Sequence, residues 1–181
     1  MKVAAPPVES TSGAVRRAAL ELFAAKGYEG TSLREVAEAV RMTKAAIYYH
    51  FPSKDAVLLA IVEPVLGETD AVLRQARSEG WTPEDVLRGL LDVMIKHHDV
   101  VAALGSDIGA QARLDAHGAG GDQEERLISL LVGESPPLAR HAAAVGAVGV
   151  LRSGTSAFSH RLEDAKEFIL DSALGALRGT A

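Results

Sequence analysis

The sequence predicts an all-α protein, in which a small N-terminal helical domain of residues 1–54 precedes a larger helical domain of residues 55–181. Three observations support this fold class. Apolar residues recur at helical spacing along most of the chain, helix-capping residues separate the apolar stretches, and no segment alternates in the way that β-strands do. With 181 residues, of which 48% are apolar, the chain can bury a core without disulfide support, and it contains no cysteine.

The N-terminal domain is expected to begin with a flexible arm and a supporting helix. Residues 1–10 contain two prolines and little apolar periodicity, which predicts the arm. A helix from about Ser12 then carries an apolar face and ends at Gly27, since glycine favours helix C-termini. We expect this helix to support the segment that follows it.

The stretch from Thr31 to Asp55 predicts two short helices joined by a tight turn. Ser32 and Glu35 form a capping box, which marks the start of the first helix. Thr43 can cap the second helix, and only a three-residue turn separates the two. Two helices in this arrangement are typical of the helix-turn-helix, whose second helix enters the major groove of DNA.

The second of these helices is predicted to be short and to present polar and aromatic side chains outward. It must end near His50, because Phe51 precedes a proline and is kept from helical geometry. Such side chains suit contacts to phosphate, sugar and base edges. The candidate DNA-binding residues are Arg34, Thr43, Lys44, Ala45, Ala46, Tyr48, Tyr49, His50 and Lys54.

We assign different expected contacts to these side chains. Lys44 can donate to guanine O6 or N7, and the small side chains of Ala45 and Ala46 allow a close approach to the bases. Tyr49 suits a base or a phosphate, and phosphate contacts are expected from Arg34, Tyr48, His50 and Lys54.

The runs LFAAKGYEGTSLREVAEAV and KAAIYYHFPSKDAVL resemble the signature of the TetR family of bacterial transcriptional regulators. The resemblance implies an N-terminal DNA-binding domain and a C-terminal domain whose last two long helices form a four-helix bundle between subunits. One residue departs from the family pattern. The family usually has glycine in the turn at the position of Arg41, where a non-glycine residue in a left-handed backbone costs roughly 1 kcal/mol or more. Either Arg41 accepts this strain or the turn is built differently.

The charge of the chain is divided unevenly between its two parts. The net charge is −5, yet residues 1–60 contain eight Lys/Arg against six Asp/Glu, which leaves eleven against eighteen for residues 61–181. The balance is therefore +2 for the first part and −7 for the second. This asymmetry has the sign expected for an N-terminal nucleic-acid binder, while the overall acidity argues against indiscriminate coating of DNA.

The last two predicted helices, near residues 135–156 and 163–178, both have wide apolar faces. Glycine costs about 1 kcal/mol inside a helix, so the glycines of the first need a packing reason, and close helix approach provides one. A single chain buries one such face more easily than two. We therefore expect a homodimer in contact through Gly146, Gly149, Phe168, Ile169, Ala173 and Leu177.

Several classes of function are disfavoured by the sequence. No P-loop, dinucleotide, metalloprotease or nucleophile-elbow motif occurs, so we expect neither an enzyme nor a cofactor. The adjacent His97 and His98 diverge by about 100° on a helix, which makes a shared metal ion unfavourable. With no N-terminal signal and no apolar run near the ~20 residues that cross a bilayer, we expect a cytoplasmic protein without a membrane partner.

The function predicted from these patterns is a repressor that binds a palindromic double-stranded DNA operator as a homodimer. A small apolar effector, bound within residues 61–160, is expected to release it, and its identity is unknown. Two alternatives are a helical protein-binding adaptor, in which the helix-turn-helix is only a scaffold, and an enzyme hidden in the helical domain. Polar side chains that can line an effector pocket are His97, His98, Gln111, Arg113, His141 and Arg152.

Overall fold

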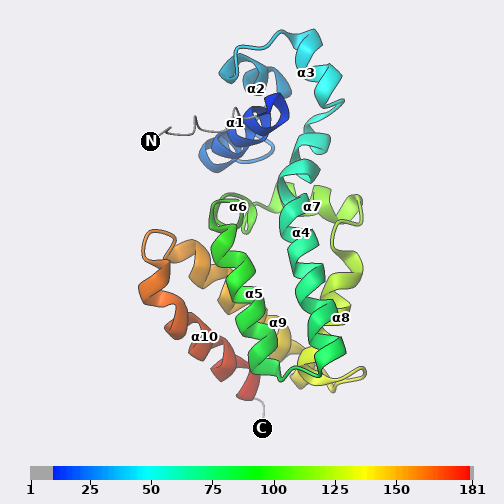
Figure 1. The fold of residues 1–181 in the computed structure, drawn as a ribbon, viewed down its shortest axis with the longest axis vertical. Helices are drawn as coiled ribbons and strands as arrows, with labels where there is room; N and C mark the ends of the chain where they lie inside the picture. The colour runs from blue at the N-terminus through cyan, green and yellow to red at the C-terminus, as the bar shows by residue number, and fades with distance from the viewer. Residues whose placement is uncertain (1–9, 180–181) are drawn as a thin grey trace, which may run out of the picture.

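The computed structural model describes residues 10–179 and folds them into ten α-helices with no β-strand in that range (Figure 1). The all-α prediction is confirmed. The first four helices are α1 (Thr11–Lys26), α2 (Leu33–Ala39), α3 (Lys44–His50) and α4 (Lys54–Glu79). They are followed by α5 (Pro83–Lys96), α6 (His98–Leu104), α7 (Ile108–Ala116), α8 (Gly121–Val132), α9 (Leu138–Ala157) and α10 (Leu162–Arg178).

Local capping interactions start the helices of the N-terminal part where the sequence predicted. The Ser32 side chain accepts a hydrogen bond from the backbone of Glu35, whose carboxylate accepts one from the backbone of Ser32, so the capping box of α2 is confirmed. Thr43 caps α3 by accepting from the backbone N–H of Ala46 at 3.2 Å. Residues 1–9, which include most of the predicted flexible arm, lie outside the described residues.

The helices surround two separate hydrophobic clusters, and α4 contributes to both. In Figure 1, α1–α3 form a small unit at one end of the molecule, and α4 leads from it into the larger unit. Val57 and Leu58 of α4 pack in the N-terminal cluster, whereas Leu73 and Ala76 pack in the C-terminal cluster with α5, α8, α9 and α10. One continuous helix therefore connects the two halves of the protein.

The N-terminal cluster also receives side chains from much later in the chain. Leu104 at the end of α6 and Ala110 in α7 are buried among the residues of α1, α2, α3 and the first turns of α4. The core beneath α3 is thus completed by residues that lie about midway along the sequence.

The packing of α9 against α10 accounts for one glycine of α9 and leaves two others open. A Cβ atom added at Gly154 would lie 2.8 Å from Ile169, so this glycine permits the close approach of the two helices within the chain. Among residues 10–179, nothing apart from the neighbouring backbone of α9 lies within 4 Å of a Cβ added at Gly146 or Gly149. These two glycines face away from the chain's own core.

The structure corrects part of the predicted dimer contact. Ile169, Ala173 and Leu177 were expected to face a second copy of the chain, but all three are buried in the C-terminal cluster of their own chain. Their side chains are already covered and are not available to another subunit. Phe168, in contrast, is 77% exposed on α10.

Candidate nucleic-acid interface

The helix α3 is fixed to the N-terminal core by one side and exposed on the other. Ile47 is fully buried and Phe51, the residue that ends the helix, is nearly so. Tyr49 is 87% exposed and Tyr48 is 45% exposed, on the outer side of the same helix. The other predicted contact residues are exposed or half-buried; they are Arg34, Thr43, Lys44, Ala45, Ala46, His50 and Lys54.

Two basic side chains of the N-terminal unit are neutralised by carboxylates within that unit. Arg34 Nε lies 2.8 Å from Glu38 Oε1, and Lys26 Nζ lies 2.7 Å from Glu35 Oε1. The hydrogen bond from Lys26, together with those from Ser32, lowers the pKa of Glu35 to about 2. Lys44 has no carboxylate partner within residues 10–179, and its Nζ lies 5.8 Å from the centroid of the Tyr48 ring.

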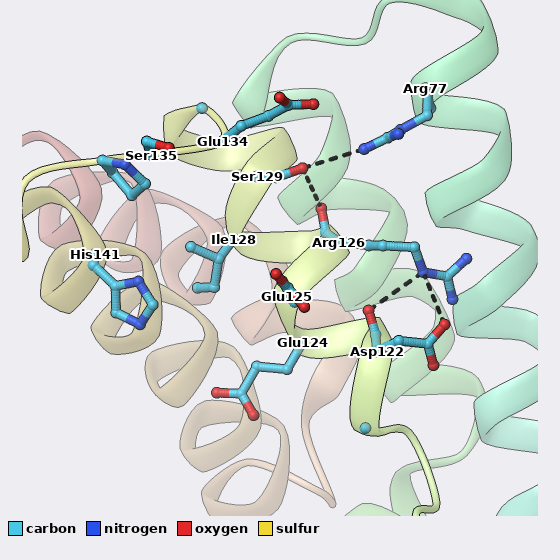
Figure 2. A pocket seen from close by; sticks show the side chains of 13 residues that line it. Arg77, Asp122, Glu124, Glu125, Arg126, Ile128, Ser129, Glu134, Ser135 and His141 are labelled. Carbon is cyan, nitrogen blue, oxygen red and sulfur yellow. Dashed lines mark hydrogen bonds and ion pairs between the residues drawn. The ribbon is translucent and has the colours of Figure 1, made fainter.

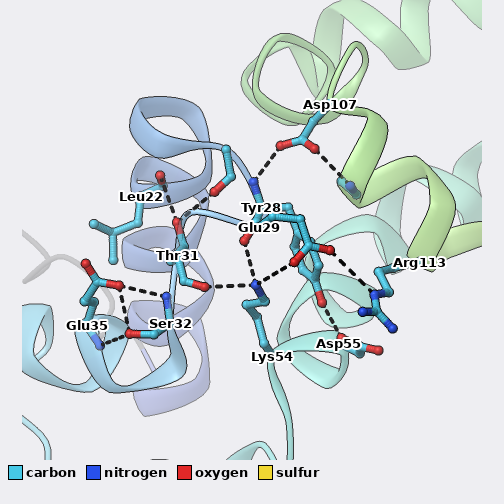
Figure 3. Close-up of polar contacts among 12 residues, drawn as sticks. Leu22, Tyr28, Glu29, Thr31, Ser32, Glu35, Lys54, Asp55, Asp107 and Arg113 are labelled. Carbon is cyan, nitrogen blue, oxygen red and sulfur yellow. Dashed lines mark hydrogen bonds and ion pairs between the residues drawn. The ribbon is translucent and has the colours of Figure 1, made fainter.

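Lys54 is held by contacts within its own chain. Its ammonium donates to the backbone oxygens of Tyr28 at 2.7 Å and of Thr31 at 2.9 Å, and it lies 4.0 Å from the centroid of the Tyr28 ring (Figure 3). A phosphate contact by Lys54 stays a prediction. In this structure the side chain holds the loop between α1 and α2 against the start of α4.

A polar network that the sequence did not reveal connects this loop to α4 and α7. Tyr28 is buried, its hydroxyl donates to Asp55 at the start of α4, and its backbone N–H donates to Asp107 Oδ2 at 2.6 Å (Figure 3). Burial, and then the bond to Asp55, raise the pKa of Tyr28, and the same bond lowers the pKa of Asp55. The other oxygen of Asp55 lies 3.1 Å from His117 Nε2 at the end of α7.

The helix α7 holds the α1–α2 loop at more than one point. Asp107 also caps α7 by accepting from the backbone N–H of Ala110 at 2.9 Å, so one carboxylate joins the helix start to the loop. Arg113 in the middle of α7 lies 3.8 Å from Glu29 of the loop. No sequence pattern predicts these contacts, since the partners of the Tyr28 N–H and hydroxyl lie 79 and 27 residues away.

The turn between α2 and α3 contains Arg41 in a left-handed conformation, with φ of 55°. Its backbone N–H donates to Glu38 O at 3.1 Å, and the N–H of Met42 donates to Ala37 O at 2.8 Å. These two bonds form the motif that commonly closes a helix with a left-handed residue, a position that usually holds glycine. Of the two alternatives for the turn, the structure shows the one in which Arg41 itself adopts the left-handed backbone, and its side chain is exposed.

Two grooves lie in the larger unit. One, of about 820 Å³, runs along α8 and the start of α9 and is lined by charged side chains such as Glu124 and Glu125 (Figure 2). Of the polar residues suggested for an effector pocket, His141 lines this groove, whereas Gln111 donates to Leu104 O. The second groove, of about 720 Å³, lies between α4 and the α7–α8 connection, and His117 is among its lining residues.

Most of the large apolar side chains that are exposed within residues 10–179 lie on α3 or along α9 and α10. Seven large apolar side chains are exposed in this range. Two of them lie on α3, one is Ile108 at the start of α7, and the other four lie on α9, its C-terminal cap and α10. The four are Leu138, Val145, Phe158 and Phe168. Within residues 10–179 there is also no group of side chains fit to hold a metal ion and no helix long and apolar enough to cross a membrane.

The N-terminal unit is similar to a described family of proteins. Residues 15–61 match the family described as bacterial regulatory proteins, tetR family. The HTH-type transcriptional regulator YuxN of Bacillus subtilis is 34% identical over 88 residues, which are 46% of this chain and 30% of YuxN. The biofilm operon negative transcriptional regulator IcaR of Staphylococcus aureus is 49% identical over 39 residues, which are 22% of this chain and 21% of IcaR. The chain thus matches less than a third of the length of these relatives.

The fold of the whole chain is also found among solved structures. The transcriptional regulator FadR from Bacillus subtilis, solved in complex with stearoyl-CoA, has a TM-score of 0.60 against this chain. The likeness covers 92% of this chain and 97% of FadR at 16% sequence identity, which establishes a shared fold.

The contacts of Lys54 lead to a prediction about stability. Lys54→Met keeps much of the stem but removes the ammonium from two carbonyl oxygens, so we expect the free energy of unfolding to fall by about 1 to 3 kcal/mol. Lys44→Met is the matched control, since its ammonium is exposed and bonds to no carbonyl oxygen in the part of the chain that the structure describes. We expect the control to change stability by less than about 0.5 kcal/mol in urea denaturation followed by circular dichroism. Equal stability of the two variants would contradict the role given to Lys54.

Proposed function

We propose that this chain, a member of the TetR family of bacterial regulatory proteins, represses transcription as a homodimer on a palindromic DNA operator and is released by a small apolar ligand. The observation that carries this proposal is α3, a short helix anchored by Ile47 and Phe51 with Lys44 and two tyrosines exposed on its outer side. The repressing role is supported by the likeness to IcaR, a negative regulator. We place this action in the cytoplasm, where bacterial DNA lies.

In this proposal α3 enters the major groove and Lys44 reads a base. Lys44 is exposed at the first position of α3 and its charge is not neutralised by a carboxylate in residues 10–179. An ammonium at this position can donate to guanine O6 or N7, while Ala45 next to it leaves room for the base edge. Tyr48, Tyr49 and His50 are exposed on the same helix and suit phosphate and sugar.

Lys44→Ala tests this reading of α3. We expect the variant to bind the operator about 1 to 3 kcal/mol more weakly and to lose its preference at one base position in each half-site. Lys96→Ala is the control, because Lys96 is exposed on α5, away from α3, and pairs with Glu68 of α4. The operator is selected by the wild-type protein from a randomised duplex pool, and affinities are measured by fluorescence anisotropy. A wild-type protein that enriches no duplex would support the alternative of a protein-binding adaptor.

The homodimer is proposed to form through the outer face of α9 and α10. Leu138 and Phe168 are large apolar side chains that are 84% and 77% exposed, and Gly146 and Gly149 leave open space beside the α9 backbone. Stable interfaces bury about 1,200 to 2,000 Å² in total and are enriched in exposed aromatic anchors of this kind. A dimer would also place two α3 helices on one face of DNA, about 34 to 36 Å or a multiple of it apart.

Phe168→Glu tests this interface. A charge in the close-packed centre of an interface is costly, so we expect dimerisation to weaken by about 2 to 4 kcal/mol, or roughly 30- to 1,000-fold. Ile108→Glu is the matched control, since Ile108 is 85% exposed but lies on α7. Sedimentation should show a dimer for the wild-type protein and for Ile108→Glu, and a monomer for Phe168→Glu. A monomeric wild-type protein at micromolar concentration would refute the interface.

The ligand is proposed to act on α4 and α7, the helices that connect the larger unit to the N-terminal unit of α1–α3. The groove between α4 and the α7–α8 connection has a volume typical of small-molecule sites, and His117 joins it to Asp55 at the start of α4. A ligand in this groove would disturb the bond between His117 and Asp55. Because FadR was solved with stearoyl-CoA, that compound is the first ligand to test.

A ligand that releases DNA must itself bind less tightly when DNA is present. For a coupling of about 1 to 3 kcal/mol, saturating operator lowers the affinity for the ligand by ~5- to 150-fold, the same factor by which the ligand weakens operator binding. Isothermal titration of stearoyl-CoA, or of a ligand found by thermal-shift screening, with and without operator measures this factor. Equal ligand affinity in both titrations would rule out the release mechanism.

A further inference from the structure

The closure of α2 explains the left-handed backbone at position 41, but it does not explain why the residue there is arginine. Arg41 is the only residue other than glycine with positive φ in residues 10–179, and a glycine would satisfy the helix-closing bonds at this position without strain. Its side chain is exposed, so it does not contribute to the core. A strained residue in a functional segment is a reason to look for a role of its side chain.

The ion pairs around Arg41 leave its guanidinium available to bind a phosphate of DNA. Glu38, the nearest preceding acidic residue, is paired with Arg34, and Glu35 is paired with Lys26. The ammonium of Lys54 is held by backbone oxygens. Arg41 and Lys44, in contrast, are exposed, and neither forms an ion pair within the residues that the structure describes.

The position of Arg41 fits a phosphate at the edge of the groove. Arg41 lies three residues before Lys44, so their Cα atoms are at most about 11 Å apart. The major groove is about 12 Å wide and is bounded on both sides by phosphates. When Lys44 faces the base edges, a long side chain at Arg41 lies near the flanking backbone, and a guanidinium can bind phosphate through two parallel hydrogen bonds.

We propose that Arg41 is a DNA-binding residue that contacts a phosphate beside the recognition helix α3. This inference rests on the proposed function, because it requires that α3 enters the major groove. It explains why the turn holds a strained arginine. The side chain adds affinity for DNA at a position where glycine would give a more stable turn.

Three substitutions separate the charge of Arg41 from its strain. Arg41→Gly removes both, so we expect the midpoint of thermal unfolding to rise by about 2 to 4 °C. We also expect the affinity for DNA at 0.15 M salt to fall about fivefold per bound protomer, and the logarithmic salt dependence to flatten by about 0.9 per protomer. Arg41→Gln keeps the strain and loses the charge, so it should bind as weakly as Arg41→Gly without the thermal gain. Arg41→Lys keeps both and should retain the wild-type salt dependence.

The measurements use the full chain and two duplexes of equal length, one selected by the wild-type protein from a randomised pool and one of unrelated sequence. A phosphate contact predicts the same flattening of salt dependence on both duplexes. Wild-type affinity and salt dependence for Arg41→Gly on both duplexes would overturn the inference and leave the proposed function intact. A loss confined to the selected duplex would assign Arg41 to a base and would also overturn it. If the wild-type protein binds neither duplex, the proposed function and this inference fail together.

Discussion

The hydrogen bonds of Tyr28 hold the N-terminal unit, α1–α3, against α4 and α7. Its backbone N–H binds Asp107 at the start of α7, its hydroxyl binds Asp55 at the start of α4, and its backbone oxygen accepts from Lys54. The ring itself is buried and lies 5.3 Å from that of Phe23 in α1. One residue of a short loop thus joins three helices, and α7 cannot shift against α4 without stretching at least one of these bonds.

The sequence predicted the features that depend on near neighbours and missed those that depend on distant ones. The capping interactions of Ser32 and Thr43 join residues three positions apart, so their pattern is visible in the chain itself. Lys54, in contrast, bonds to oxygens 26 and 23 residues away. A lysine in the first turn of a helix has the same local pattern whether it meets solvent, phosphate or a carbonyl oxygen. Its partners are set by tertiary packing alone.

A similar ambiguity explains the partly wrong dimer assignment in α10. An apolar face predicts that a helix side is buried, but it does not say whether the same chain or a second copy covers it. Ile169 and Ala173 face α9 and the rest of the C-terminal cluster, while Phe168 points away from it, because neighbours on a helix differ by about 100° in direction. Only the structure separates the two sets.

The burial of Leu104 and Ala110 in the N-terminal core limits how such a protein can evolve. These residues belong to α6 and α7, yet they are 2% and 0% exposed among the side chains that support α3. The removal of a buried leucine side chain alone lowers the free energy of unfolding by about 2 to 5 kcal/mol. An N-terminal unit separated from α6 and α7 would therefore lose much of its stability. The N-terminal part is therefore not a portable module. In the proposed function, DNA specificity would therefore change through substitution of exposed residues on α3, which leaves the core completed by α6 and α7 intact.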